Sequence, residues 1–173
     1  VGGIQYYVDQ LCRGLCDAGD SVVLLGSSAA DSDEFDRAAP YEVVRERTPV
    51  LLPTPLTARH AVRLVERMQA DVVLFGAAFP LAGLAGHIRR RTGVGSVAFT
   101  HGLEVSAART PGGTRVLRRI GDNLAALTYV SGWCREILEP AFGPAPRHLM
   151  LPPAVDPQEY HRGVDGREVR QRW

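Results

Sequence analysis

Short apolar runs alternate along the chain with segments of helical periodicity, and this alternation restricts the fold more than any other feature. Continuous apolar runs are typical of strands buried on both faces of a parallel sheet. They occupy residues 21–28, 71–77, 95–100, 124–131 and 147–153. The intervening segments repeat apolar side chains at helical spacing; they span residues 4–18, 57–69, 80–91, 110–123 and 132–143. This order predicts the α/β class, with a doubly wound, Rossmann-like parallel sheet.

Three other segments complete the expected organisation. Residues 41–47 alternate apolar and polar side chains, which is typical of a strand near a sheet edge. Residues 29–40 are polar and rich in turn formers, so we expect a loop. The polar residues 161–173 read as a loop that enters a helix.

The composition narrows the partners and the compartment. With 45% apolar and 23% charged residues and a formal net charge of +1, nothing indicates a nucleic-acid partner. No apolar run reaches membrane-spanning length and no secretory signal is present, so we expect any membrane contact to be peripheral. The three cysteines, Cys12, Cys16 and Cys134, indicate reduced thiols. We expect Cys12 and Cys16 to be buried small side chains rather than metal ligands.

His101 is the first candidate for a functional side chain. Ligands of such sheets bind outside the carboxyl ends of the strands, and His101 follows the strand that ends at Thr100, with Gly102 and Glu104 in the same loop. A structural histidine with satisfied hydrogen bonds is the alternative. His60, His87, His148 and His161 lack this placement, and we interpret them as surface or capping residues.

Gly2 and Gly3 precede the first predicted helix. A pair of glycines often forms only a turn, but here it would let a diphosphate approach the free N–H groups of the helix. The dinucleotide fingerprint G-x-G-x-x-G is not matched, which disfavours a nicotinamide or flavin enzyme. Asp31 and Asp33 lie in a polar acidic stretch, and we interpret them as solvated residues rather than metal ligands.

Arg115, Arg118 and Arg119 fall at i, i+3 and i+4 of a predicted helix and form one basic face. A solvated surface is one interpretation of this face. Binding of an anionic head group, such as a lipid phosphate, is the other.

An ordered set of motifs resembles a known family. The stretches GGIQYYVDQL, PTP, FGAAFPLAGLAG, THGLEV, LRRIG, LTYVS and LPPAVD resemble, in this order, the N-terminal domain of family 4 glycosyltransferases with the GT-B architecture. Within the family the chain is most similar to bacterial phosphatidylinositol mannosyltransferases. The resemblance runs from residue 1 to about residue 160. It implies an acceptor-side domain over residues 1–160, with 161–173 leading toward a second domain.

The resemblance also implies roles for the candidate residues. His101 would contact the donor sugar in a retaining mechanism that uses neither a metal nor a cofactor. Gly2 and Gly3 would abut the donor diphosphate and sugar. The arginines 115, 118 and 119 would hold the acceptor head group, and Asp156 would match the aspartate that closes the first domain.

The implied reaction transfers mannose from GDP-mannose to a phosphatidylinositol mannoside-type lipid, in the cytoplasm at the inner face of the plasma membrane. One alternative is another nucleotide sugar and acceptor, such as UDP-N-acetylglucosamine and inositol phosphate. Another is a non-catalytic Rossmann-like module.

The chain departs from the family pattern at both ends. The family has a strand before the double glycine and a second domain that binds most of the nucleotide, and neither is present in these residues. We therefore expect an open sheet edge, exposed apolar helix faces and low stability, unless another chain supplies a strand. We also expect the chain alone to be inactive.

Overall fold

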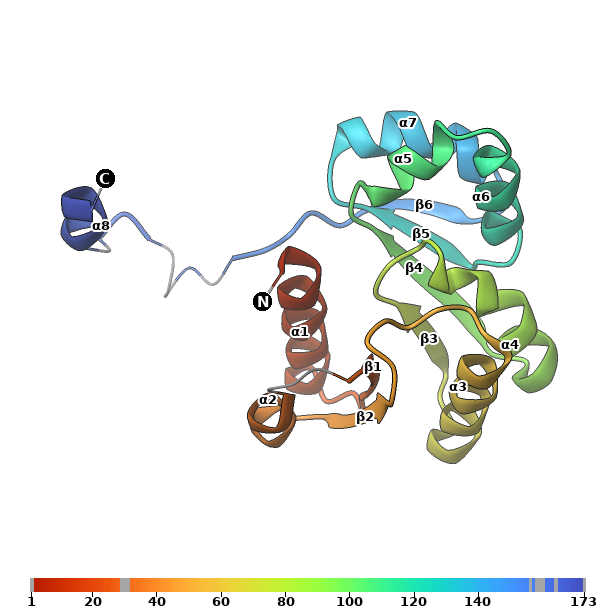
Figure 1. Cartoon of the computed structure of the whole chain (residues 1–173), viewed down its shortest axis with the longest axis horizontal. Helices are drawn as coiled ribbons and strands as arrows, with labels where there is room; N and C mark the ends of the chain where they lie inside the picture. The colour runs from red at the N-terminus through yellow and green to blue at the C-terminus, as the bar shows by residue number, and fades with distance from the viewer. Residues whose placement is uncertain (1, 29–31, 156, 158–160, 164, 173) are drawn as a thin grey trace.

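The computed structural model describes residues 2–28, 32–155, 157, 161–163 and 165–172, in which two separate parallel sheets are formed (Figure 1). The two-stranded sheet has the order β1-β2 and the four-stranded sheet the order β3-β4-β5-β6. The strands are β1 (Val23–Ser27), β2 (Glu42–Glu46), β3 (Val72–Phe75), β4 (Gly95–Thr100), β5 (Ala126–Tyr129) and β6 (Arg147–Met150). All pairs are parallel, as the sequence predicted.

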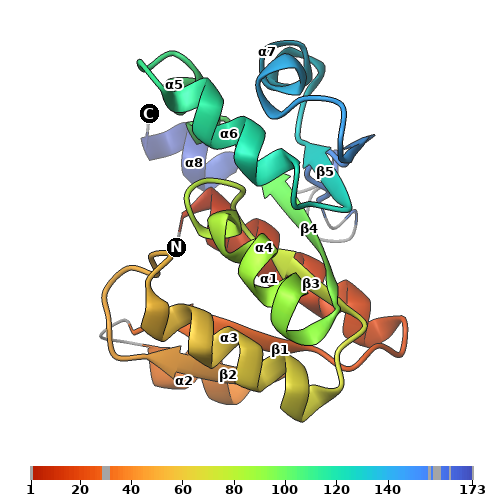
Figure 2. The ribbon, with the colours of Figure 1, turned by 90° about the vertical axis from the view of Figure 1, so that its right-hand side faces the viewer.

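Helices cover the sheets from several sides. They are α1 (Gly3–Asp17), α2 (Ser32–Ala38), α3 (Pro55–Met68), the 3₁₀ helix η1 (Leu81–Leu84), α4 (Ala85–Thr92), α5 (Leu103–Ala108), α6 (Gly113–Gly121), α7 (Gly132–Phe142) and α8 (Arg167–Arg172). α1 stands on one side of β3, and α3 and α4 lie on the other side (Figures 1 and 2). In Figure 1, α8 lies away from both sheets.

Local sequence signals explain where two of the helices begin. The hydroxyl of Thr54 accepts a hydrogen bond from the N–H of Thr57, and Pro55 follows it at the start of α3. The hydroxyl of Ser131 accepts from the N–H of Cys134 at the start of α7. These capping bonds set the first residues of α3 and α7. Both helices begin at the carboxyl edge of the strands, where a parallel sheet binds its ligands.

The core lies between the four-stranded sheet and helices α4, α6 and α7. Its largest fully buried apolar side chains are Ile88, Leu117, Leu127, Tyr129, Leu138 and Phe142. They come from β5 and from all three helices. Strand β5 is buried along its whole length, and four of the six residues of β4 are buried.

Two short helices were not expected from the sequence. The predicted loop over residues 29–40 was wrong for Ser32–Ala38, which form α2; Asp33 and Glu34 in its first turn and Arg37 in its last turn complement the helix dipole. Helix α5 replaces part of the predicted loop after β4.

The sheet is less continuous and less covered than the apolar runs predicted. Strands β1 and β3 are not paired with each other, so one edge of each lacks a partner among the described strands. The prediction that residues 71–77 are buried was wrong for Val72 and Leu74, which are 46% and 38% exposed. These two side chains share one face of β3 because side chains alternate along a strand. Helix α1 approaches this face at Gly76, where an added Cβ would meet Val8, but it leaves Val72 and Leu74 exposed.

We predict that β1 and β2 exchange their amide hydrogens faster than β4 and β5. A two-stranded sheet of half-buried strands is only marginally stable, whereas β5 is buried along its whole length. Exchange followed by mass spectrometry on peptides measures the difference. If a strand from outside these residues completes the sheet, supplying it slows exchange in β1 and β3 together. Equal protection of the two sheets would contradict the prediction.

Candidate functional site

His101 lies at the carboxyl edge of the four-stranded sheet, directly after β4. Its Nε2 atom is 2.7 Å from the carbonyl oxygen of Gly76, the residue that follows β3. A carbonyl oxygen only accepts, so Nε2 carries the proton and donates. The side chain therefore bridges the ends of two neighbouring strands, at the place where the sequence predicted a ligand site.

Tyr7 of α1 packs against this histidine. The rings of Tyr7 and His101 meet edge to face, with centroids 5.1 Å apart and planes at 80°. Tyr7 makes a second edge contact with Phe99 of β4, at 5.9 Å, and its hydroxyl donates to the carbonyl of Leu151, 3.2 Å away. Burial raises the pKa of the Tyr7 hydroxyl. One side chain thus joins α1, β4 and the segment after β6.

Glu104 holds the backbone around His101. Its side chain is only 1% exposed, and its Oε2 atom accepts from the N–H groups of His101 (3.2 Å) and Gly102 (3.1 Å). Gly102 has a φ of 98°, a left-handed conformation that favours glycine. The Oε1 atom of Glu104 is buried and has no hydrogen-bond partner in the part of the chain that the structure describes. Such an unpaired buried oxygen costs about 1–3 kcal/mol.

Gly2 and Gly3 lie at the start of α1, about one helical turn from Tyr7. The backbone of Gly2 is extended, no side chain caps the helix, and its first turn contains no acidic residue. An added side chain at Gly3 would meet nothing within 4 Å. Since α1 rises about 1.5 Å per residue, the free N–H groups lie within about 8 Å of Tyr7 along the helix axis. The structure therefore brings the double glycine and His101 to the same edge.

The arginines of α6 are placed elsewhere. Arg115, Arg118 and Arg119 are all exposed. α6 connects parallel strands and returns toward their amino ends, so Arg118 and Arg119 in its last turn lie away from His101. Arg118 donates to the carbonyl of Pro140 in the last turn of α7 (3.3 Å), which is a capping interaction. The structure does not bring these side chains to the histidine.

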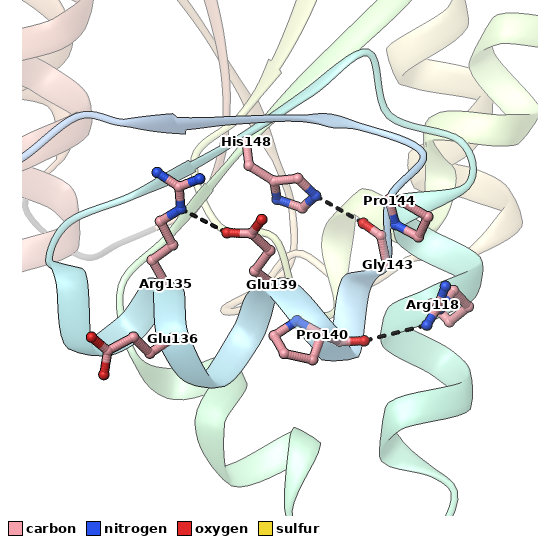
Figure 3. A pocket seen from close by; sticks show the side chains of 8 residues that line it. All are labelled: Arg118, Arg135, Glu136, Glu139, Pro140, Gly143, Pro144 and His148. Carbon is pink, nitrogen blue, oxygen red and sulfur yellow. Dashed lines mark hydrogen bonds and ion pairs between the residues drawn. The ribbon is translucent and has the colours of Figure 1, made fainter.

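A cavity of about 580 Å³ lies beside Arg118, between α7 and the start of β6 (Figure 3). Its polar groups largely satisfy one another. Arg135 pairs with Glu139 at 2.6 Å, and His148 accepts from the buried Tyr129 hydroxyl at 2.7 Å and donates to the carbonyl of Gly143 at 2.8 Å. His148 thus contacts the C-cap residue of α7, in keeping with the capping role expected from the sequence.

A second hollow, of about 470 Å³, separates α3 from α4, the two helices at the front of Figure 2. It is lined by Arg59, Arg63, Arg91 and His87, with Glu66 as the one acidic residue. Three exposed apolar side chains lie at or just before the start of α3: Val50 (59% exposed), Leu52 (49%) and Leu56 (58%). Sequence analysis did not single out this surface, although the three arginines of α4 are consecutive.

The cysteines and the remaining candidates add no binding site. Cys12 is buried, as predicted, and burial together with nearby Asp9 raises the pKa of its thiol to about 11; Cys16 is half-buried. Asp156 and Asp31 lie outside the described residues. Within the described ranges, no three His, Cys, Asp or Glu side chains gather so that they could hold a metal ion. No helix there is long and apolar enough to cross a bilayer.

One protein family matches nearly the whole chain. Residues 1–159 match the family described as Glycosyltransferase Family 4. A Corynebacterium glutamicum protein, named GDP-mannose-dependent monoacylated alpha-(1-6)-phosphatidylinositol monomannoside mannosyltransferase, is 35% identical over 162 residues, covering 92% of the chain and 42% of the relative. A Mycobacterium tuberculosis protein, named GDP-mannose-dependent alpha-(1-6)-phosphatidylinositol monomannoside mannosyltransferase, is 37% identical over 177 residues, covering 99% of the chain and 46% of the relative. The chain therefore spans less than half the length of these relatives.

A solved structure is similar in fold. MurG from Acinetobacter baumannii superposes with a TM-score of 0.57 and 14% identity, over 90% of the chain and 43% of MurG. At this level of identity, the likeness shows the α/β arrangement with parallel strands.

We predict that Tyr7→Ala lowers the free energy of unfolding by about 2 kcal/mol, because it removes both ring contacts and the bond to Leu151. Tyr7→Phe keeps the ring and should cost about 1 kcal/mol or less. Urea unfolding of the chain measures both values. Tyr6→Ala, at the more exposed neighbour, is the matched control and should change stability by about 0.5 kcal/mol. Equal losses at Tyr6 and Tyr7 would show that Tyr7 does not hold the site together.

Proposed function

The chain belongs to glycosyltransferase family 4, as its motifs predicted, and from this we propose that it forms the acceptor-side domain of a mannosyltransferase. The proposed reaction moves mannose from GDP-mannose to a phosphatidylinositol mannoside. Two relatives that are 35% and 37% identical to the chain support this reaction, because their names give both substrates. Retention of configuration and independence from a metal ion stay predictions from the family resemblance.

One structural observation carries the proposal. His101, Tyr7 and the uncapped start of α1 meet at a single edge of the sheet, where parallel α/β folds bind ligands. Free backbone N–H groups at a helix start suit a diphosphate, and a histidine beside them suits the attached sugar. His101 and Gly3 together thus fit the two chemical parts of a nucleotide sugar.

We propose that this domain supplies part of the complete site. The chain covers 42% and 46% of the two relatives, so the remaining residues of such an enzyme would supply the other groups around the nucleotide. The domain boundary near residue 160 and the extra strand between β1 and β3 are part of this proposal. The unpaired edges of β1 and β3 are the observation that supports a further strand between them.

The lipid acceptor also requires contact with a membrane surface, and we propose that α3 and α4 make it. α3 carries three arginines and one glutamate, and α4 carries three consecutive arginines. Exposed Leu52 and Leu56 lie at the end of α3 that faces the His101 edge. Basic side chains beside exposed apolar ones suit an anionic lipid surface, with the apolar groups at the level of the head groups. Such docking would present the lipid head groups to the candidate site.

Transfer activity tests the proposed reaction. The chain is joined to the remaining residues of the Mycobacterium relative, and mannosyl transfer from GDP-mannose to phosphatidylinositol mannoside is measured. We expect this completed enzyme to be active and the chain alone to be inactive. His101→Ala should slow transfer about 10²-fold, since a polar group at the reacting sugar is lost. His161→Ala, at an exposed histidine outside the site, is the control and should leave the rate unchanged.

Transfer of a different sugar, or transfer to a different acceptor, would contradict the proposed substrates and favour the alternative reaction with another nucleotide sugar and acceptor. Binding of GDP-mannose without any transfer would favour a non-catalytic module. An undiminished rate in His101→Ala would remove that residue from the site.

Vesicle binding tests the membrane surface. The double variant Arg59→Glu/Arg63→Glu should weaken co-sedimentation with phosphatidylinositol-containing vesicles at least about tenfold, because each basic group near an anionic surface contributes about 1 kcal/mol. Arg118→Glu/Arg119→Glu is the matched pair on α6. If only the α6 variant loses vesicle binding, the membrane contact belongs to the arginines first predicted from the sequence. Unchanged binding in both would overturn anionic docking.

A further inference from the structure

Trp133 is exposed at the carboxyl edge of the four-stranded sheet, beside the turn that carries His101. It is the second residue of α7, the helix that follows β5, and its side chain is 57% exposed. The next residue, Cys134, is buried, and its Sγ atom lies 3.9 Å from the place that a Cβ on Gly102 would take. The start of α7 therefore adjoins the turn after His101.

The backbone that carries Trp133 is held in place. The hydroxyl of Ser131 accepts from the N–H of Cys134 at 3.2 Å, which caps α7. A side chain added at Gly132 would meet nothing within 4 Å, so the space next to Trp133 is open. Helix α5, which packs against α7 (Figure 1), begins with Leu103, another exposed apolar residue. The indole thus stands on a fixed backbone, with apolar surface and free space beside it.

The strand order separates Trp133 from the candidate donor site. In the order β3-β4-β5-β6, His101 follows β4 and bonds to Gly76 after β3, and Tyr7 of α1 packs on its ring. The groups that suit the nucleotide sugar therefore lie toward β3, whereas α7 starts on the other side of β4. We propose that Trp133 determines specificity for the acceptor, by stacking its indole on a sugar ring of the acceptor head group.

The chemistry of an indole suits a sugar ring. Its face carries partial negative charge, which attracts the C–H hydrogens on one face of a pyranose. Its N–H group can donate to a sugar hydroxyl. An aromatic side chain also loses little conformational entropy when it is fixed. A phosphate would be repelled by the same face. The proposal rests on the proposed glycosyl transfer and narrows its acceptor to a head group that presents a sugar at the end of β5.

The geometry of the sheet favours an acceptor that already carries mannose. Neighbouring strands lie about 4.8 Å apart, so the ends of β3 and β5 are separated by about 10 Å. The proposed membrane contact, α3, lies on the β3 side of the sheet (Figure 2), and Trp133 lies on the β5 side. A head group whose phosphate stays near α3 reaches Trp133 only through a further sugar beyond its inositol. We therefore expect Trp133 to favour phosphatidylinositol mannoside over phosphatidylinositol.

Steady-state kinetics of the completed enzyme tests the assignment. Trp133→Ala should raise the KM for phosphatidylinositol mannoside about fivefold, because the stacking contact is lost, and should leave the KM for GDP-mannose unchanged. Trp133→Phe keeps an aromatic face and should recover most of the loss. Val116→Ala, which shortens an exposed apolar side chain on α6, is the matched control and should change neither KM.

Two soluble competitors measure the sugar contact without a membrane. Glycerophosphoinositol with mannose and glycerophosphoinositol without it are compared as inhibitors that compete with the lipid acceptor. We expect the mannose to strengthen inhibition of the unsubstituted enzyme, and Trp133→Ala to reduce that gain about fivefold. An equal loss for both competitors would overturn the sugar contact, since it would show that the indole acts on the inositol phosphate or on the fold.

Fluorescence tests whether Trp133 is free for the acceptor in the completed enzyme. The difference between the emission of this enzyme and that of its Trp133→Phe variant isolates the signal of Trp133. We expect acrylamide to quench that signal, and the mannosylated competitor to protect it. Protection without any competitor would show that the remaining residues of the enzyme cover the indole, which would overturn the proposal.

The two proposals can fail separately. Active transfer with an unchanged acceptor KM in Trp133→Ala, or with a raised KM for GDP-mannose instead, would overturn the role of Trp133 and leave the glycosyltransferase function standing. If the completed enzyme transfers no sugar, the proposed function fails. Protection of Trp133 by the mannosylated competitor would then still support the contact, and unprotected fluorescence would overturn it.

Discussion

The contact of Tyr7 with the carboxyl edge of the four-stranded sheet is the interaction on which the candidate site depends. The two sheets share no hydrogen-bonded strand pair, so helices connect them. One is α3, whose Thr57 and His60 bond to Glu46 at the end of β2, and the other is α1. On one side of α1, Tyr7 touches His101 and Phe99; on the other, Asp9 accepts a 2.6 Å hydrogen bond from the hydroxyl of Tyr41, next to β2. Burial and that bond raise the pKa of the Tyr41 hydroxyl, so it stays a donor at neutral pH. α1 therefore holds the weaker sheet and the site in one arrangement.

This dependence links stability to binding. The core sits behind β4 and β5, whereas Tyr7 and His101 are half-buried at their rim. Local opening favours regions with few buried contacts, so α1 can separate from the edge at a lower free energy than global unfolding requires. A ligand that touches both the start of α1 and His101 binds only the closed arrangement. It would stabilise the β1–β2 unit without contacting it, through Asp9 and Tyr41.

The sequence predicted those features that depend on periodicity and strand ends. Parallel pairing and the place of His101 followed from apolar runs and from the rule that ligands bind at the carboxyl edge. Helix α2 was missed because its acidic residues resemble a solvated loop, and they stabilise a helix only at its first turn. Glu104 was noted beside His101, but its two backbone bonds depend on the turn at Gly102. The bond from Arg118 to Pro140 joins residues 22 positions apart, and helical spacing carries no information about it.

The amino-acid composition also does not predict how charge is distributed over the surface. A net charge of +1 gave no reason to expect a nucleic-acid partner, and it says nothing about where the charges lie. In the fold, however, carboxylates are placed beside particular cations: Asp9 beside Arg13, Asp36 beside Arg45 and Glu139 beside Arg135. Arg59, Arg63 and Arg91 have no such ion pair among the described residues, and they line one hollow with a single glutamate. Because pairing removes acidic groups locally, a nearly neutral chain presents a basic face between α3 and α4. A field of that kind acts over about 8 Å at physiological salt, so it would orient the domain on an anionic surface before any specific contact forms.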